Sequence, residues 1–153
     1  MGKPSFVYVT YIATTPEEVW RALVDSEMTR LYWGGPTGGL ENISDWKPGS
    51  RWESRRGDPG RTVAMVGRVL ESTPPRRLVI TWARPRDADA PEKHSRVTFD
   101  IEPHGERLVR LMILHEDLDP EMADSISRGW PKVVSNLKTL LETGHVLPTL
   151  PWP

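Results

Sequence analysis

The stretch GWPKVVSNLKTLLETG, residues Gly129 to Gly144, decides the fold. Apolar residues recur there at helical spacing, and the same stripe begins near Pro120, so the pattern predicts one amphipathic helix over 120–142. At 1.5 Å per residue such a helix is roughly 34 Å long, enough to cross a small sheet. The stripe consists of Met122, Ile126, Trp130, Val133, Val134, Leu137, Leu140 and Leu141.

A proline inside this helix, Pro131, needs an explanation. Its nitrogen has no hydrogen to donate to the Ser127 carbonyl, and its ring crowds the preceding turn. We therefore expect a kink or a short break near Gly129. Because a bent helix suits a curved surface, the stretch predicts a C-terminal helix lying against a concave sheet.

The rest of the chain supplies that sheet. Residues 5–13 are typical of a strand, 14–25 of a helix, and 26–35 of a second, short helix. About six strands follow, bounded by Pro, Gly and Asp turns. Among them, 95–103 alternates cleanly between apolar and polar residues, as a half-buried antiparallel strand does. The predicted class is α+β, with the order strand, helix, helix, six strands, long helix.

Composition limits the classes of function. A chain of 153 residues suits one domain, with an expected core over about 5–144 and a proline-rich tail over 145–153. The absence of cysteine excludes disulfides, thiolate catalysis and cysteine-zinc sites, and is compatible with the cytoplasmic location that we expect. A net charge of −1 argues against nucleic-acid and anionic-membrane partners.

Charged and histidine residues give no metal or cofactor motif. His94, His104 and His145 match no zinc spacing, and no nucleotide-binding fingerprint occurs, so we expect neither a metal nor a cofactor. Four arginines gather around one hairpin, but acidic residues interrupt them, which favours a solvated face over a phosphate site. They are Arg51, Arg55, Arg56 and Arg61.

Five segments together carry a family resemblance. They are IATTPEEVWRALVDSEMTRLYW, SDWKPGSRW, GRVLESTPPRRLVITW, the strand ending in LHE, and GWPKVVSNLKTLLETG. From about Tyr8 to Gly144 the chain resembles the START / birch-pollen-allergen-like (SRPBCC) superfamily, in the branch of activator-of-heat-shock-chaperone-ATPase homologue-like proteins. The resemblance implies a helix-grip fold, in which a curved antiparallel sheet wraps a long C-terminal helix, with a cavity between them. Members include ligand carriers, cyclases and proteins of unknown role.

With this resemblance, aromatic side chains on the concave face predict a pocket for a small hydrophobic or aromatic ligand. The segment after the second helix supplies three tryptophans that we expect at its entrance: Trp33, Trp46 and Trp52. The full candidate set is Trp33, Trp46, Trp52, Met65, Trp82, Phe99, His115 and Trp130. The alternative is that these residues fill the hollow as an ordinary core.

Two other functions remain open. One is a cyclase-like or hydrolase-like enzyme with His115 as acid or base, helped by Glu53 and Arg84 if both face inward. The other is a co-chaperone-type interaction module. We assign no catalytic residue, and we expect an apolar or amphipathic small molecule as partner. Apolar residues on the second face of strand 107–116 also predict a homodimer; they are Leu108, Met112 and Leu114.

Overall fold

The computed structural model describes residues 3–34 and 39–148. Seven strands form one antiparallel sheet in the order β1-β7-β6-β5-β4-β3-β2. This confirms the α+β helix-grip architecture and the predicted order of elements. The elements are β1 (Phe6–Ile12), α1 (Pro16–Val24), α2 (Ser26–Tyr32), β2 (Glu41–Ser44), β3 (Arg51–Arg55), β4 (Val63–Thr73), β5 (Arg77–Trp82), the short 3-10 turns η1 (Pro85–Asp87) and η2 (Pro91–Lys93), β6 (Ser95–Pro103), β7 (Val109–Glu116) and α3 (Pro120–Thr143).

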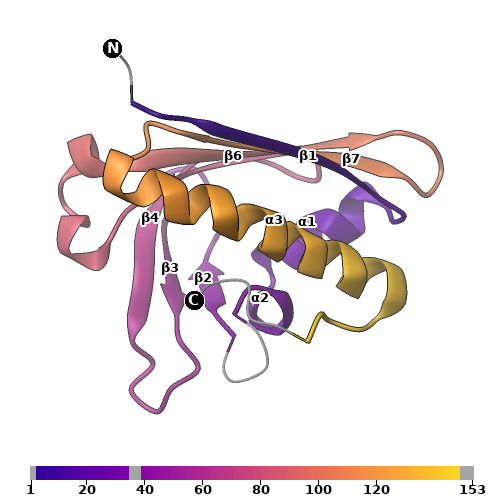
Figure 1. The fold of residues 1–153 in the computed structure, drawn as a ribbon, viewed down its shortest axis with the longest axis horizontal. Helices are drawn as coiled ribbons and strands as arrows, with labels where there is room; N and C mark the ends of the chain where they lie inside the picture. Colours follow the sequence, from indigo (N-terminus) through magenta and orange to yellow (C-terminus); the bar gives the residue numbers. More distant parts are fainter. Residues whose placement is uncertain (1–2, 35–38, 149–153) are drawn as a thin grey trace.

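The sheet is strongly curved, and β4 is the strand that joins its two parts. Its first half pairs with β3 and its second half with β5, with an irregular register between Val69 and Glu71. In Figure 1, β2, β3 and β4 turn away from the layer formed by β1, β6 and β7. An irregularity of this kind bends a strand and increases its twist, and so helps to make the sheet concave.

Gly67 of β4 is required where the Trp52 ring of β3 and the Thr81 carbonyl of β5 approach the backbone closely. The indole N–H of Trp52 donates to the Thr81 carbonyl at 2.7 Å, directly over this glycine. A Cβ at Gly67 would lie 1.9 Å from the Thr81 oxygen and 2.3 Å from the Trp52 ring nitrogen. The glycine therefore leaves room for the Trp52 ring, which then enters the concave side of the sheet.

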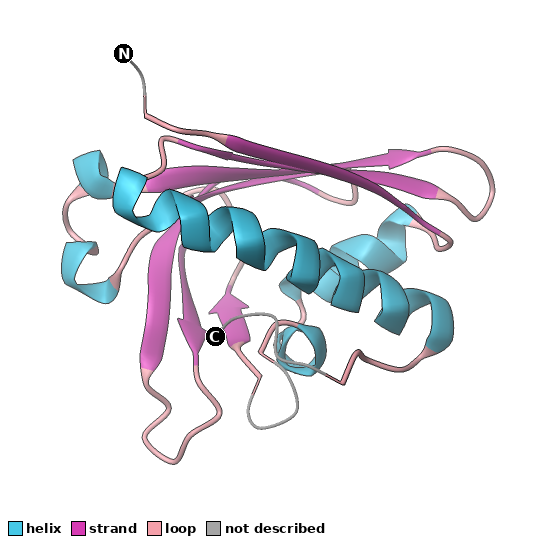
Figure 2. Cartoon of the chain, viewed as in Figure 1, coloured by secondary structure: helices cyan, strands magenta, loops and turns pink. Residues whose placement is uncertain are grey.

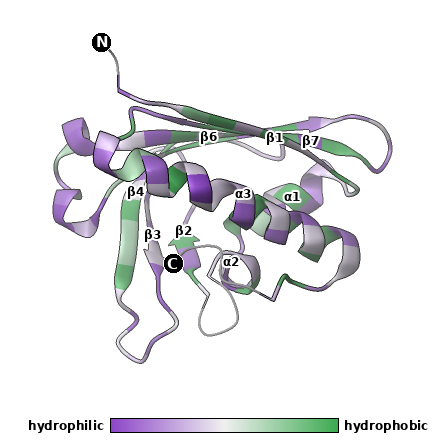
Figure 3. Ribbon diagram, viewed as in Figure 1, coloured by the Kyte–Doolittle hydropathy of each residue, from purple (hydrophilic) through white to green (hydrophobic). Residues whose placement is uncertain are grey.

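The three α-helices lie on the concave side, as Figure 2 shows, and α3 packs on β1, α1 and α2. Capping residues determine where these helices begin and end. Thr15 caps α1 by accepting from the Glu18 N–H, and Asp119 caps α3 by accepting from the Glu121 N–H. Gly144 ends α3 in the left-handed conformation, with φ at 80°. Hydrophilic residues follow the outward side of α3, which Figure 3 colours purple.

Of the expected kink or short break near Gly129, the break is wrong, because α3 runs as one helix over Pro120–Thr143 with Pro131 inside it. The kink stays a prediction. A proline in a helix interior costs about 3 kcal/mol locally. Burial on both sides of Pro131 opposes that cost: Trp130 and Val133 are each 1% exposed. Tertiary packing therefore keeps the helix continuous where the local sequence favours an interruption.

The start of the proline-rich tail is held against the helices by one buried side chain, Asn136. Its amide nitrogen donates to the Tyr32 carbonyl at 2.8 Å, and its oxygen accepts from the Leu147 N–H at 2.7 Å. Residues 149–153 of the tail lie outside the described residues. Within the described ranges, no helix is both long enough and apolar enough to cross a membrane.

Candidate functional site

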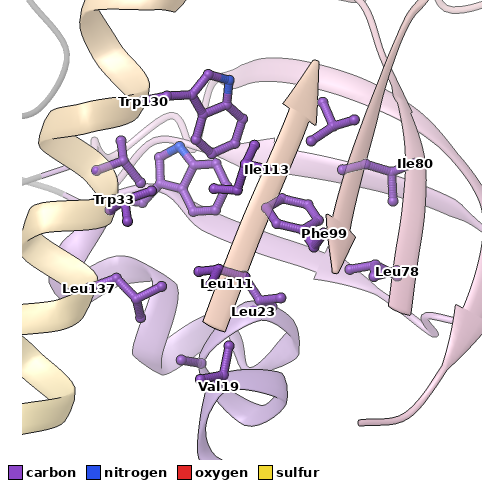
Figure 4. Close-up of a cluster of buried hydrophobic side chains, with 14 of the residues drawn as sticks. Val19, Leu23, Trp33, Leu78, Ile80, Phe99, Leu111, Ile113, Trp130 and Leu137 are labelled. Carbon is purple, nitrogen blue, oxygen red and sulfur yellow. The ribbon is translucent and has the colours of Figure 1, made fainter. Parts of the chain in front are cut away.

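Five aromatic side chains meet under the middle of α3, and we call them the aromatic cluster: Trp33, Trp52, Trp82, Phe99 and Trp130. Each is at most 7% exposed. The Trp130 ring centroid lies 5.5 Å from that of Trp33, 5.8 Å from that of Trp82 and 5.8 Å from that of Phe99. Figure 4 shows Trp130 and Leu137 pointing from α3 toward the strands. These predicted pocket residues therefore pack on one another.

The predicted entrance does not form as expected. Trp33 and Trp52 are 3% and 1% exposed. Trp52 therefore belongs to the packed interior, whereas Trp33 also borders an open space described below. Trp46 is half-buried and stacks on Trp52, with ring centroids 6.5 Å apart. The space left among these three residues and Phe99 is about 10 Å³, roughly the room of one water molecule. Large side chains therefore fill the middle of the hollow.

His115 is fully buried, and both its ring nitrogens are used. Its Nδ1 accepts from the Trp130 indole N–H at 3.1 Å. An indole nitrogen can only donate, so the neutral ring carries its hydrogen on Nε2 and donates to the Ser95 hydroxyl at 2.8 Å. Ser95 in turn donates to the Trp82 carbonyl at 3.2 Å. Burial lowers the pKa of His115 to about 3, which keeps the ring neutral.

This tautomer is unsuited to acid or base catalysis at neutral pH. A base would need a free nitrogen to take a proton, and here Trp130 occupies one nitrogen of His115 while the other already carries hydrogen. The residues expected to assist His115 do not gather around it either. Glu53 lies on the face of β3 opposite the buried Trp52 and bonds to Arg55, so the idea that it faces inward is wrong. The described geometry gives His115 a structural role.

Open space appears beside the first half of α3, where it faces β3 and β4. We call this space the apolar crevice. Its volume is about 250 Å³. It is lined by Trp33, Leu40, Ser54, Arg56, Ala64, Met65, Trp82, Met122, Ser125 and Ile126. Most of these groups are apolar, as in pockets for small organic ligands.

Four polar groups interrupt the apolar wall: the hydroxyls of Ser54 and Ser125, the Arg56 guanidinium and the Trp82 indole N–H. Among the described residues that line it, Arg56 is the one with a charge, and its side chain is exposed. Ser54 and Trp82 are 3% and 7% exposed. The Ser54 hydroxyl and the Trp82 indole nitrogen have no hydrogen-bond partner among the described residues. A buried polar group without a partner is uncommon in folded proteins. Both residues line the crevice, but neither polar atom is exposed to it.

A second space, the polar crevice, lies by the first turn of α3 and has a volume of about 480 Å³. It shares Trp82, Met122 and Ile126 with the apolar crevice. Charged side chains from the 84–93 segment line it, Arg84 included. His94 holds that segment to the sheet through Thr81, at 2.8 Å, and the Asp87 carbonyl, at 2.9 Å. No group of three or more His, Asp or Glu side chains in the described ranges could hold a metal ion.

The structure thus divides the eight predicted pocket residues. Trp33, Met65 and Trp82 line the apolar crevice. The other five belong to the packed interior or its edge, and direct contact between them and a ligand stays a prediction: Trp46, Trp52, Phe99, His115 and Trp130. Sequence reasoning missed Ser54, because no motif marks it, and assigned Arg56 to a solvated face without a sign that it also borders a crevice. Met122 and Ile126 were visible as the first part of the apolar stripe of α3, without a sign that space lies beside them.

Comparison with known proteins agrees with this architecture. The family model "Activator of Hsp90 ATPase homolog 1-like protein" matches residues 13–142. CalU16 from Micromonospora echinospora is 20% identical with a TM-score of 0.70, covering 92% of this chain and 77% of that one. ChR145 from Cytophaga hutchinsonii is 23% identical with a TM-score of 0.72, covering 92% and 95%. PFC0360w, an HSP90 activator from Plasmodium falciparum, is 21% identical with a TM-score of 0.70, covering 90% and 95%.

At these identities the solved structures show that the fold is shared, and they carry no conclusion about activity. No curated protein matches this chain.

Proposed function

Since the chain belongs to the family of Activator of Hsp90 ATPase homolog 1-like proteins, which often bind hydrophobic ligands, we propose that it binds a small, largely apolar molecule. The proposed site is the apolar crevice beside the first half of α3, and not the middle of the hollow. The supporting observation is one unfilled, mostly apolar space next to an interior that is otherwise closely packed.

The size of the crevice limits the ligand. Its volume is about 250 Å³, whereas a dry cavity of about 150 Å³ accepts one benzene molecule. A compact body of one or two rings therefore suits the site. Met65 and Met122 lie on opposite walls, one on β4 and one on α3. Because methionine side chains are flexible and polarizable, they can adjust to such a body.

Apolar contact alone supports weak binding. Burial of ~150 Å² of ligand surface contributes at most about 4 kcal/mol, which corresponds to a Kd in the millimolar range. Tighter binding needs polar contacts in addition. We therefore expect the polar groups of the crevice wall to decide which molecules bind well.

A blocking variant tests the proposal. Ala64 is a half-buried residue of β4 that lines the crevice, so Ala64→Phe places a ring in the proposed site. We expect 2-naphthoate to raise the melting temperature of the unmodified chain and to have no such effect on Ala64→Phe. The matched control is Val7→Phe on β1, a residue that is 58% exposed. Equal binding to Ala64→Phe and the unmodified chain would contradict the proposed site.

A further inference from the structure

We propose that the bound molecule is an amphipathic acid that extends across both crevices. Its compact apolar body lies in the apolar crevice, a flexible linker passes Met122, and its carboxylate binds the Arg84 guanidinium in the polar crevice. The inference rests on the proposed function, because it names the chemical class of the ligand at that site and adds a second contact region. Three observations support it: the position of the two crevices, the direction of the Arg84 side chain, and the pairing of the charges around it.

The two crevices lie next to each other along the first half of α3. Trp82, Met122 and Ile126 border both of them. Eight charged side chains line the polar crevice, whereas among the described residues one, Arg56, lines the apolar crevice. Met122 is half-buried between them, and a methionine side chain is flexible enough to give way. Walls that change from apolar to charged suit a molecule with an apolar body and a polar end.

Arg84 directs its side chain to the concave side of the sheet. Ala83 pairs with Val66 through two backbone hydrogen bonds, of 2.8 and 3.0 Å, so strand pairing extends one residue past Trp82. Arg84 keeps an extended backbone, with φ at −69° and ψ at 151°. Because side chains alternate between the two faces of an extended chain, Arg84 shares the face of the buried Trp82. It is half-buried and lines the polar crevice, so part of its surface stays accessible there.

The Arg84 guanidinium has no partner inside the protein. Within the part of the chain that the structure describes, its side chain makes no hydrogen bond and no ion pair. Its five N–H donors therefore remain available to a ligand. A carboxylate can accept two of them side by side, which is the geometry that makes arginine–carboxylate pairs strong and directional.

The acidic residues of the polar crevice are occupied or exposed. Asp87 has two basic side chains of its own segment at 3.8 and 3.9 Å. Asp119 accepts from a backbone N–H in the first turn of α3. Glu92 and Asp117 are exposed, so water and salt weaken their repulsion of an anion. An anionic group in this crevice therefore has Arg84 as its half-buried, unpaired partner.

The experiment uses three acids that share a naphthalene ring and differ in linker length: 2-naphthoate, 3-(2-naphthyl)propanoate and 5-(2-naphthyl)pentanoate. Each is compared with its primary amide, because a longer linker adds the same apolar surface to both. With the full chain, titrations followed by ligand-observed NMR give the ratio of the amide Kd to the acid Kd at each length. We expect this ratio to rise about 10-fold from the shortest pair to the longest, since a long linker lets the carboxylate reach Arg84.

Variants assign the rise to Arg84. Arg84→Gln should remove most of it and leave the affinities of the amides nearly unchanged. The matched control is Arg110→Gln on β7, which loses the same charge at another half-buried arginine that lines neither crevice. Arg84→Lys should keep part of the rise, because lysine supplies the charge without the paired donors.

A second readout follows Arg84 in the unmodified chain. Its Nε–H signal, identified by its absence from the Arg84→Lys spectrum, should shift when 5-(2-naphthyl)pentanoate is added. The corresponding amide should shift it less, because a neutral group forms the weaker hydrogen bond. This measurement keeps the test valid if Arg84→Gln alters the fold.

Three results overturn the inference. A ratio that does not change with linker length, while acids and amides still bind, removes the contact with Arg84 and leaves the proposed function standing. A rise that persists in Arg84→Gln places the carboxylate elsewhere. No binding of any of the six molecules overturns the inference together with the proposed function.

Discussion

The two halves of α3 differ in how they meet the sheet. In the second half, Trp130, Val133, Val134 and Leu137 are each at most 2% exposed. In the first half, before Gly129, Ile126 is the buried residue and Met122 and Ala123 remain half-buried, with open space beside Met122 and Ile126. One helix on one concave sheet thus provides both a core and a crevice. The position of the large aromatic rings decides which half becomes which.

Trp130→Ala is the variant for which this contrast predicts the largest effect. This ring contacts much of the aromatic cluster and donates to His115, so we expect a loss of about 3–5 kcal/mol in the free energy of unfolding. On the open half, Met122→Ala should change it by less than about 1 kcal/mol, because the side chain is half-buried beside empty space. Urea unfolding measures both, and similar losses in the two variants would contradict the contrast.

A pH series tests the packed half through His115. Its pKa is about 3 in the folded chain against 6.5 when exposed. The unfolded chain therefore binds the extra proton first, and stability falls as pH decreases below 6.5, by up to about 1.4 kcal/mol per pH unit. Above pH 6.5 this contribution is fully present. We expect urea unfolding at pH 7.5, 6.0 and 5.0 to follow this trend.

Two histidine variants serve as controls for this pH series. His115→Gln should flatten the dependence between pH 6.0 and 5.0, whereas His94→Gln, at a half-buried histidine outside the packed interior, should leave it in place. An unchanged slope in His115→Gln would show that other groups cause the pH dependence.

Substitutions that enlarge a small side chain also distinguish the packed region from the open one, with a smaller expected effect on stability. Ala22 on α1 is fully buried in the core, whereas Ala64 lines the crevice. Ala22→Leu should cost about 1–3 kcal/mol, because a full core must shift to admit extra atoms. Ala64→Leu should cost less than about 1 kcal/mol, since it enters open space. Equal costs, measured by urea unfolding, would mean that the crevice closes in solution.

Much of the fold was readable from the sequence, and the site was not. Period-two and helical patterns predicted the order of elements correctly. The filling of the hollow was not readable, because it depends on ring positions set by distant contacts. Trp52 is an example: it reaches inward because Gly67, on the neighbouring strand, lets its N–H bond to Thr81. Ser54 and Arg56 come to border the same space as residues of α3 through tertiary geometry alone.

The smallest expected effect concerns self-association through the convex face of the sheet. On it, Leu114 of β7 is half-buried beside the exposed Val7 of β1, and the ion pairs Arg96–Glu116 and Arg77–Asp100 lie nearby. Opposite charges beside an apolar strip can match a second copy turned about a two-fold axis, so we propose a weak homodimer through this face. Light scattering at tens of micromolar should show partial dimer, lost in Leu114→Glu. A purely monomeric mass would contradict it.

The most direct test of the central claim is the location of the bound ligand. Met65 and Met122 line the apolar crevice, whereas Met28 lies on α2 and Met112 lines a hollow on the convex face. With 13C-labelled methionine methyl groups, assigned by Met→Leu variants, 2-naphthoate should shift the Met65 and Met122 signals and leave Met28 and Met112 in place. Shifts at Met28 or Met112, with none at Met65 and Met122, would contradict a binding site beside the first half of α3.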